Sequence, residues 1–413
     1  APKMIKSPFI NPLILKLMNQ TPYANRLHIA LFGRRNSGKS SLVNALTGQD
    51  TVIVSPTPGT TTDPVTKAME IHPLGPCLLI DTPGFDDEGE LGEMRVERTL
   101  KIIGKTDIAL LLCETGDVQE QEWLQRLKER GIPVILLLNK ADARPNTTEL
   151  AEQIKASCGQ PPIIVSAKDG TGIEAINRAI LEKFPADFGE QTITGSLVAE
   201  GDVVVLVMPQ DLQAPKGRLI LPQVQTIREL LDKKCLVMSV TTDQLIPALA
   251  VLKKAPKLII TDSQVFGYVY ENKPAESMLT SFSVLFAAYK GDLPYYVEGA
   301  RHIDALNAHS RVLIAECCTH APLKEDIGRE KIPRMLRKRF GDSLAVDIVS
   351  GTDFPEDLSG YDLIIQCGAC MFNRKYVMSR IERAREQGVP MTNYGVTIAH
   401  LTGILDKISM PET

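Results

Sequence analysis

The chain has 413 residues, of which 44% are hydrophobic and 23% are charged, and its formal net charge is -4. This length predicts two to four domains of about 100–200 residues each, and the composition is that of a soluble globular protein. The broad positive charge that nucleic acid or an anionic membrane requires is missing, so we expect neither as a partner. No apolar run reaches the about 18–20 residues that span a bilayer, and residues 1–20 lack a signal-peptide pattern. We therefore expect a cytoplasmic protein whose eight cysteines are mostly reduced or bound to metal.

Residues 1–185 are predicted to form a first α/β domain. Apolar strands alternate there with helical patterns, which favours a mostly parallel, doubly wound sheet. We predict a closing helix at Ile173–Phe184 and a linker from Pro185 to Thr194. The predicted strands are Leu27–Phe32, Cys77–Ile80, Ile108–Cys113, Val134–Leu138 and Ile163–Val165.

Two smaller α/β domains with mainly parallel sheets are predicted to follow, over residues 190–272 and 273–413. In both, short apolar runs are separated by segments of helical periodicity. Predicted strands of the second domain are Val203–Met208, Leu236–Val240 and Leu258–Thr261, with helices at Pro222–Lys233 and Leu245–Leu252. Predicted strands of the third are Val312–Ala315, Ala345–Val349 and Leu363–Gln366.

Residues 33–40 read Gly-Arg-Arg-Asn-Ser-Gly-Lys-Ser, which is the pattern of a phosphate-binding P-loop. The loop follows a predicted strand and opens a helical run at Ser41–Leu46, the context that the motif needs. A glycine turn without a ligand is the alternative interpretation of this motif taken alone. Lys39 is predicted to reach the β- and γ-phosphates, and Ser40 to bind Mg²⁺. The residues expected to contact the phosphates are Asn36, Ser37, Gly38, Lys39, Ser40 and Ser41.

A second motif, Asp81-Thr82-Pro83-Gly84, follows the predicted strand Cys77–Ile80. We expect Asp81 to hold Mg²⁺, either directly or through water, and the Gly84 N–H to sense the γ-phosphate. This motif follows the P-loop in the order that GTP-binding domains use, which makes a ligand-free glycine turn far less plausible.

The sequence also contains two motifs that suit a guanine base. Asn139-Lys140-Ala141-Asp142 follows one predicted strand, and Ser166-Ala167-Lys168 follows the next. The Asp142 carboxylate can accept hydrogen bonds from the N1–H and 2-amino groups of guanine, a donor pair that adenine lacks. We expect Ser166, Ala167 and Lys168 to support the base. The combined motifs predict a P-loop GTPase domain that hydrolyses GTP to GDP and phosphate.

These residues resemble the translation-factor-like GTPases, in particular the branch with tRNA-modification and ribosome-assembly GTPases. The run Pro58-Gly59-Thr60-Thr61-Thr62-Asp63 looks like the switch I signature of that branch. The resemblance implies that Thr61 completes the Mg²⁺ shell when the γ-phosphate is present. It extends over about 160 residues, roughly one domain.

Two residues bear on the rate of hydrolysis. Phe85 follows Gly84, where many GTPases carry a glutamine that orients the attacking water, so intrinsic hydrolysis should be slow. Asn36 occupies a P-loop position that helps to hold K⁺ in potassium-activated relatives. Our hypothesis is that K⁺ supplies the missing positive charge; alternatively, Asn36 is only a favourable loop residue.

The eight cysteines divide into two groups. Four are isolated in the sequence, and burial as structural residues is the better interpretation for them: Cys77, Cys113, Cys158 and Cys235. The other four lie in Cys317-Cys318-Thr319-His320 and Cys367-Gly368-Ala369-Cys370, each just after a predicted strand. Open parallel sheets bind ligands at such strand ends. If the two strands are neighbours, Cys318, Cys367 and Cys370 converge on one metal centre.

The spacing leaves the metal open. Three cysteines with His320 suit a structural zinc site, whereas three thiolates with an exchangeable fourth ligand suit a 4Fe–4S cluster. A redox dithiol at Cys367 and Cys370 is a further interpretation of the C-x-x-C motif alone.

The whole chain resembles the FeFe-hydrogenase maturation GTPases, the HydF family. The resemblance rests on the GTPase motifs, on Glu316-Cys317-Cys318-Thr319-His320, on Glu325-Asp326-Ile327-Gly328 and on the C-x-x-C motif. It implies a homodimer formed by the middle domain and a 4Fe–4S cluster on Cys318, Cys367 and Cys370. It also implies a scaffold that receives a transient di-iron precursor from radical-SAM maturases and delivers it to the apo FeFe-hydrogenase.

One position departs from the family pattern. Many members carry a histidine before the C-x-x-C motif, where this chain has Gln366. The fourth cluster ligand therefore remains open between His320, Glu316, water and the incoming precursor. Two other functions are also compatible with the sequence: an RNA-directed GTPase, and a zinc-stabilised interaction protein with a GTPase switch.

Overall fold

The computed structural model describes residues 23–48, 65–71, 75–85, 99–184, 192–209, 219–317 and 326–412. The chain forms two compact units, residues 1–186 and 187–413. The predicted α/β class with mainly parallel sheets is confirmed, because all strand pairs in the described segments are parallel except one. No helix in those segments is long and apolar enough to cross a membrane.

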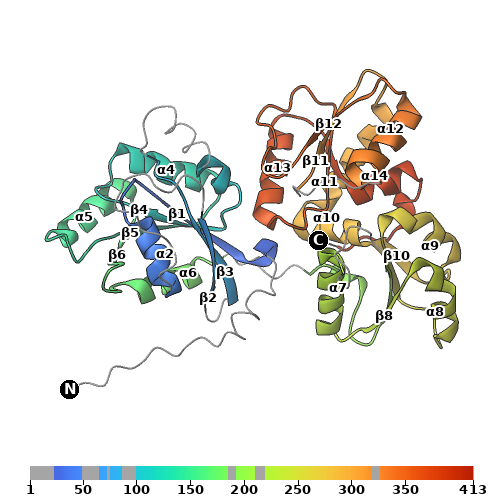
Figure 1. Ribbon diagram of the computed structural model, residues 1–413, viewed down its shortest axis with the longest axis horizontal. Coiled ribbons are helices and arrows are strands. Elements are labelled where there is room, and N and C mark those ends of the chain that lie inside the picture. Colours follow the sequence, from blue (N-terminus) through green and yellow to red (C-terminus); the bar gives the residue numbers. More distant parts are fainter. Residues whose placement is uncertain are drawn as a thin grey trace. The chain divides into compact units, whose positions relative to one another are not determined.

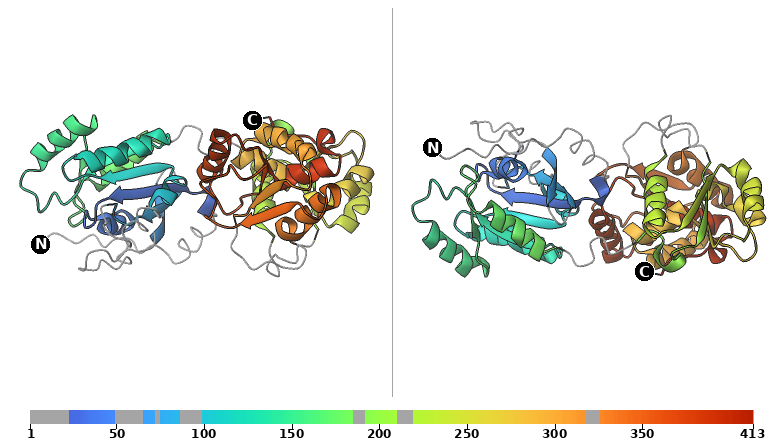
Figure 2. Two further views of the ribbon diagram at one scale, coloured as in Figure 1. Left: turned by 90° about the horizontal axis from the view of Figure 1, so that it is seen from above. Right: turned by 90° about the horizontal axis from the view of Figure 1, so that it is seen from below.

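The described residues of the first unit form one six-stranded sheet. Its order across the sheet is β2-β3-β1-β4-β5-β6, and helices cover both faces (Figure 2). Because both faces are covered, β1, β4 and β5 are buried along their whole length. The strands are β1 (Leu27–Gly33), β2 (Val65–Ile71), β3 (Gly75–Asp81), β4 (Ile108–Leu112), β5 (Val134–Leu138) and β6 (Ile163–Ile164).

All of these strands were expected except β2. It pairs antiparallel with β3 at the edge of the sheet, and several of its residues are exposed. Thr66, Lys67 and Glu70 interrupt its apolar pattern, so the rule that finds buried strands from apolar runs does not find this one.

Four helices whose bounds lie within the described residues pack on the first sheet. They are α2 (Lys39–Thr47), α4 (Val118–Glu129), α5 (Thr147–Cys158) and α6 (Ile173–Glu182). Trp123 of α4 is buried between two aromatic rings, with centroid distances of 6.1 Å to Phe32 and 5.0 Å to Phe85. The helix is thereby fixed against the end of β1 and against the residue that follows Gly84.

The second unit contains two four-stranded parallel sheets. The first has the order β10-β9-β7-β8 and the second β12-β11-β13-β14. The strands of the first are β7 (Val203–Val207), β8 (Leu236–Val240), β9 (Leu258–Thr261) and β10 (Met278–Ser281). Those of the second are β11 (Arg311–Ala315), β12 (Ala345–Val349), β13 (Leu363–Gln366) and β14 (Met391–Asn393).

Eight α-helices connect these strands in the described part of the second unit. Four accompany the first sheet: α7 (Leu221–Asp232), α8 (Leu245–Val251), α9 (Phe266–Asn272) and α10 (Phe282–Lys290). Four accompany the second: α11 (Leu293–Arg301), α12 (Ile332–Phe340), α13 (Arg374–Glu386) and α14 (Tyr394–Leu401). Single helical turns lie at 195–197, 242–244, 263–265, 302–305, 327–331 and 405–407.

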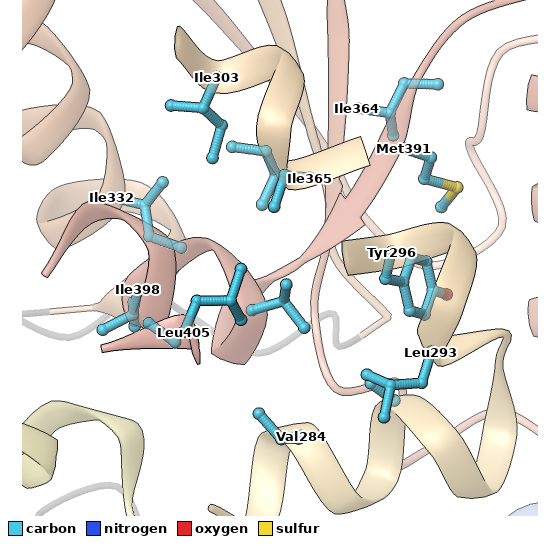
Figure 3. Packing of buried hydrophobic residues seen from close by; sticks show 14 of the residues in the cluster. Val284, Leu293, Tyr296, Ile303, Ile332, Ile364, Ile365, Met391, Ile398 and Leu405 are labelled. Atoms are coloured by element: carbon cyan, nitrogen blue, oxygen red, sulfur yellow. The ribbon is translucent and has the colours of Figure 1, made fainter. Parts of the chain in front are cut away.

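The two sheets of the second unit share one hydrophobic core. Helix α10 lies between them and contacts α7 on one side and α11, α13 and α14 on the other (Figure 1). Figure 3 shows Val284 of α10 and Tyr296 of α11 in the same cluster as Ile365 of β13. Strand β10 pairs with β9, so the first sheet continues past residue 272, where we placed the domain boundary. Its short run ends in Thr280 and Ser281, which weakens the apolar signal.

The linker prediction at Pro185–Thr194 needs correction at its end. Residues 185–191 lie outside the described residues. Ile193 and Thr194 are buried, and the Glu229 carboxylate of α7 accepts both of their backbone N–H groups. These two residues therefore belong to the packed second unit.

Candidate functional site

The P-loop lies between β1 and α2, as predicted. Gly38 precedes the helix with φ of 91°, and a Cβ atom there would lie 2.3 Å from Nδ2 of Asn139. Only glycine fits this close approach in this backbone conformation. Asn36, at the exposed tip, has a left-handed φ of 56°, which asparagine tolerates better than most residues.

Lys39 is folded back into the loop. Its ammonium group is buried and donates hydrogen bonds to the carbonyl oxygens of Gly33 at 2.8 Å and Arg34 at 2.6 Å. The charge therefore lies within the mouth of the loop, close to the N-terminus of α2. Backbone N–H groups, the helix dipole and a lysine together attract phosphate groups.

The Ser40 hydroxyl donates a 2.5 Å hydrogen bond to Oδ2 of Asp81. Asp81 is fully buried at the end of β3, and within the described residues its Oδ1 atom has no hydrogen-bond partner. Burial raises the pKa of the Asp81 carboxyl, while the Ser40 hydrogen bond and the charge of Lys39 oppose this effect. A buried, unsatisfied carboxylate oxygen beside a hydroxyl fits a hard cation such as Mg²⁺. Thr61, the third predicted Mg²⁺ residue, lies outside the described residues.

The residue after Gly84 is packed in the core. Phe85 is 3% exposed, stacks on Trp123 and has its carbonyl oxygen bound by the Gln119 side chain at 3.2 Å. Its side chain is therefore held by the core. This agrees with the chemical argument from sequence, since phenylalanine has no polar group that could orient water.

The guanine motifs meet the P-loop through side-chain hydrogen bonds. Asn139 donates from Nδ2 to the Ser37 carbonyl at 3.0 Å and accepts the Ala167 N–H at 3.2 Å. The buried Ser166 hydroxyl donates to Asp142 at 2.9 Å. The remaining two predicted residues also take part: Lys140 donates to the Asn36 carbonyl, and Lys168 lies 3.7 Å from the Asp142 carboxylate.

The P-loop and the region of the guanine motif are also connected through a loop that carries no recognisable sequence motif. This β4–α4 loop comprises residues 113–117. From the loop, Asp117 forms a 2.5 Å ion pair with Arg34 of the P-loop, and Glu114 forms a 3.2 Å ion pair with Arg144 beyond the guanine motif. The buried Glu120 carboxylate accepts backbone N–H groups of the loop. Sequence reasoning missed this bridge because its ion pairs join residues far apart in the chain.

The cysteine motifs lie at neighbouring strand ends, as the metal-centre hypothesis requires. Strands β11 and β13 are parallel neighbours, with Ala315 opposite Gln366. The buried Cys317 donates its backbone N–H to the Cys367 sulfur at 3.1 Å. No group of three or more His, Cys, Asp or Glu side chains is arranged to hold a metal among the described residues, but Cys318 and His320 are not among them.

Two buried cations flank the cysteines. Lys290, at the end of α10, is 2% exposed and donates to the carbonyl oxygens of Ala369, Cys370 and Phe372 at 3.1, 3.2 and 2.8 Å. Burial lowers the pKa of Lys290 to about 8, against the pull of the neighbouring thiols.

The second cation, Arg380, is also 2% exposed. It lies 3.8 Å from the Cys317 sulfur and donates to the Gly351 carbonyl at 2.6 Å. In the described part of the chain, neither Lys290 nor Arg380 has a carboxylate partner within salt-bridge distance. Both were missed from the sequence, because a basic residue within or at the end of a helix usually faces water.

Glu316, one of the candidates for the fourth ligand, and Gln366, which stands in the place of the family histidine, both form hydrogen bonds with other residues. The Glu316 carboxylate accepts hydrogen bonds from Arg329 at 2.8 and 3.0 Å and from Ser350 at 3.2 Å. Gln366 is buried and donates to the Tyr296 hydroxyl at 3.3 Å. The carboxylate of Glu316 is thus occupied, whereas the amide oxygen of Gln366 is buried and has no hydrogen-bond partner among the described residues.

We predict that Asp81→Asn stabilises the nucleotide-free protein at neutral pH and removes its response to Mg²⁺. Because burial raises the folded-state pKa of Asp81, the folded state binds this proton more tightly than the unfolded state. Its stabilising contribution is therefore present at acid pH and is lost as pH rises through the raised pKa. The amide has no such loss, so its melting temperature should exceed that of the wild type at neutral pH and match it at acid pH.

Thermal unfolding with and without Mg²⁺ and GDP measures both effects. Ser40→Ala is the matched comparison, because it keeps the carboxylate while removing the hydroxyl. It should weaken the Mg²⁺ response without the gain at neutral pH. A Mg²⁺-dependent rise in melting temperature that is as large in Asp81→Asn as in the wild type would contradict the assignment.

Curated proteins that are similar to this chain match it over about 160 residues. The chain is 34% identical over 167 residues to the tRNA modification GTPase MnmE of Ralstonia nicotianae, covering 38% of this chain and 34% of that protein. It is 37% identical over 160 residues to the MnmE of Nitrosomonas europaea, covering 38% and 34%. The chain thus spans about a third of the length of these curated relatives.

Solved structures also align with the chain. A probable GTP-binding protein engB is 27% identical with a TM-score of 0.32, covering 38% of this chain and 97% of that chain. A point variant of Aquifex aeolicus Era bound to GDP.AlF4- is 20% identical with a TM-score of 0.36, covering 59% and 97%.

Three family models match the chain. The 50S ribosome-binding GTPase model matches residues 28–140, so the first unit is a P-loop GTPase domain. The hydrogen maturase F dimerization domain matches residues 193–291, and the hydrogen maturase F tetramerization domain matches residues 294–411. These last two models together span more than half of the chain, and with the GTPase domain before them they place this protein in the hydrogen maturase F family.

Proposed function

We propose that this protein is a GTP-hydrolysing scaffold of FeFe-hydrogenase maturation. In this proposal, Cys318, Cys367 and Cys370 hold a 4Fe–4S cluster. The scaffold receives a di-iron precursor from radical-SAM maturases and delivers it to the apo-hydrogenase. Family membership supports the general role, and the buried charges around the cysteines are the observation that supports the cluster.

The argument from charge begins with Lys290 and Arg380. A buried cation costs several kcal/mol in lost hydration unless an anion compensates it. The carbonyl oxygens that bind Lys290 offer only partial charge. With neutral, packed thiols, the compensation of both cations would be limited to carbonyl oxygens and to the aromatic rings that face them, three around Arg380 and one beside Lys290. Three thiolates on a metal centre carry net negative charge and compensate both.

The same residues suit an iron–sulfur cluster with an exchangeable position. Lys290 holds the backbone of the C-x-x-C loop, and the Glu316 carboxylate is bound by Arg329. When bound, a 4Fe–4S cluster supplies an iron to which an incoming precursor can attach. Zinc on three thiolates would satisfy the charges equally well, so metal identity has to be measured.

We predict that Lys290→Met strongly reduces cluster loading. The substitution removes a buried charge beside the thiolates and three hydrogen bonds to the loop. After anaerobic reconstitution with iron and sulfide, the wild type should hold about four irons per chain and give an S = 1/2 signal on reduction. The variant should hold less than half of that iron. Any cluster that remains should have a more negative midpoint potential, because a buried cation favours the reduced, more negative state.

Lys273→Met provides the matched control. Lys273 also donates to three carbonyl oxygens of its local loop, at 3.1, 3.3 and 2.7 Å, but this loop contains no cysteine. This variant should load iron as the wild type does. Equal loss of iron in both variants would mean that the substitutions impair folding and not the cluster site specifically. Circular dichroism would show such a folding defect. One tightly bound zinc and no iron in the wild type would refute the proposal that the cysteines hold a 4Fe–4S cluster.

We propose that the dimerization domain forms a homodimer through the edge of its sheet. Strand β8 is an edge strand, and its Leu236 is 62% exposed. The neighbouring helix α7 exposes Leu231, at 57%. An apolar edge strand with unpaired backbone groups is prone to pairing with another strand, and a second copy of this chain offers the same edge.

Leu236→Asp should therefore weaken the dimer. A charge within an apolar interface is expected to raise the dissociation constant about tenfold or more, equivalent to about 1.4 kcal/mol. Light scattering after size-exclusion chromatography measures the change. Val118→Asp, at a 71% exposed position in the first unit, is the control and should leave the mass unchanged. A dimer that Leu236→Asp leaves intact would rule out this edge.

We propose that GTP hydrolysis is slow and stimulated by K⁺. Phe85 is held in the core, and Asn36 is exposed at the tip of the P-loop. Turnover in K⁺ buffer should exceed that in Na⁺ buffer about tenfold, a change of about 1.4 kcal/mol in the barrier. Asn36→Gly keeps the left-handed backbone but removes the side-chain oxygen, so it should lose the difference and retain GDP binding. Equal wild-type turnover in both salts would refute the proposal.

A further inference from the structure

Two cysteines that look isolated in the sequence meet in the core of the GTPase domain. Cys113 directly follows β4, and Cys158 is the last residue of α5. Both are buried, at 2% and 7% exposure, and belong to the same hydrophobic cluster. The two thiols interact, and a hydrogen bond between them raises the pKa of Cys113 and lowers that of Cys158.

The backbones around the two thiols are also in close contact. A Cβ atom at Gly116 would lie 2.1 Å from the Ser157 hydroxyl and 3.1 Å from the Cα atom of Ile154. The β4–α4 loop is therefore pressed onto the last turn of α5. A disulfide requires such proximity, because sulfur atoms on distant backbones cannot be joined without a large movement.

Cys158 is the more reactive of the two. It lines, with Ser157, a surface pocket of about 580 Å³ between α4 and α5. The hydrogen bond from Cys113, aided by Ser157, lowers the pKa of Cys158 to about 6 despite its burial. The pKa of Cys113 is raised by that hydrogen bond and by burial. At neutral pH the pair is a thiolate beside a thiol, and the thiolate is the nucleophile.

We propose that Cys113 and Cys158 form a redox-active dithiol, which a hydroperoxide converts into a disulfide that weakens nucleotide binding. The Cys158 thiolate attacks one peroxide oxygen, the O–O bond breaks, and the departing oxygen takes up a proton. Cys158 is then a sulfenic acid. The Cys113 sulfur attacks the Cys158 sulfur, the S–O bond breaks, and hydroxide leaves as water with the Cys113 proton. With hydrogen peroxide, two thiols lose two electrons in total and two waters form.

The link to the nucleotide site is the β4–α4 loop. Its Asp117 holds Arg34 of the P-loop, and its Glu114 holds Arg144 beside the guanine motif. Forming the S–S bond draws Cys113, at the start of this loop, toward α5. The ion pairs at both ends of the loop then shift, so the affinity for GDP should fall severalfold.

The test uses the full chain, anaerobically prepared and treated with hydrogen peroxide. Remaining thiols are alkylated in acid, and mass spectrometry of the peptides should find Cys113 linked to Cys158. GDP affinity, measured with a fluorescent analogue, should fall at least threefold on oxidation and recover with dithiothreitol. Cys113→Ser and Cys158→Ser should show neither effect. Cys77→Ser, which removes another buried thiol of this domain, should respond like the wild type.

Two results would overturn the proposal. One is the absence of the linked peptide while Cys158 is oxidised to sulfinic acid or stays reduced. The other is a disulfide that leaves GDP affinity unchanged, which would disprove the coupling. Peptide mapping is done on the wild type, so it decides the first point even if the serine variants fold poorly. Neither result depends on the cluster in the second unit.

Discussion

Parallel pairing of adjacent strands is the constraint on which both candidate sites depend. In a parallel ladder, neighbouring strands finish at the same edge, so the segments that follow them are brought together. Leu31 lies opposite Asp81 in the first sheet, which sets the P-loop beside the carboxylate suited to Mg²⁺. Ala315 lies opposite Gln366 in the third sheet, which sets Cys317 beside Cys367. The same backbone geometry thus positions a phosphate loop in one unit and a thiol cluster in the other.

Each site is then defined by charges that the protein buries and only partly compensates. Asp81 is buried with one oxygen unsatisfied, near the buried ammonium group of Lys39. Lys290 and Arg380 are buried near thiols and carbonyl oxygens. Such arrangements cost folding free energy, and the cost falls when an ion of opposite charge binds. This favours a cation beside Asp81 and an anionic group beside Lys290 and Arg380.

The sequence predicts the central strands and the nucleotide motifs well, because both are local signals. Continuous apolar runs indicate strands covered on two faces, and the P-loop motif carries its own spacing. Strands β2 and β10 escape this rule, since Lys67 and Thr280 interrupt short runs. The ion pair of Asp117 with the P-loop and the burial of Lys290 are not predicted from the sequence for another reason. Their roles follow from partners such as Arg34, far away in the chain, and no local pattern encodes such contacts.

The two thiol pairs illustrate how surroundings decide the chemistry of one side chain. Cys113 and Cys317 both follow buried parallel strands, and the pKa of each is raised, that of Cys113 by its hydrogen bond with Cys158 and by burial and that of Cys317 chiefly by burial. The charges near them have opposite sign. The Glu120 carboxylate raises the pKa of Cys113 further, whereas the Arg380 guanidinium lowers that of Cys317. Negative surroundings keep a thiol protonated and favour its role as a hydrogen-bond donor to a reactive neighbour. In the second unit the guanidinium of Arg380 opposes the effect of burial on Cys317, so a cysteine at a strand end meets different electrostatic surroundings in the two units.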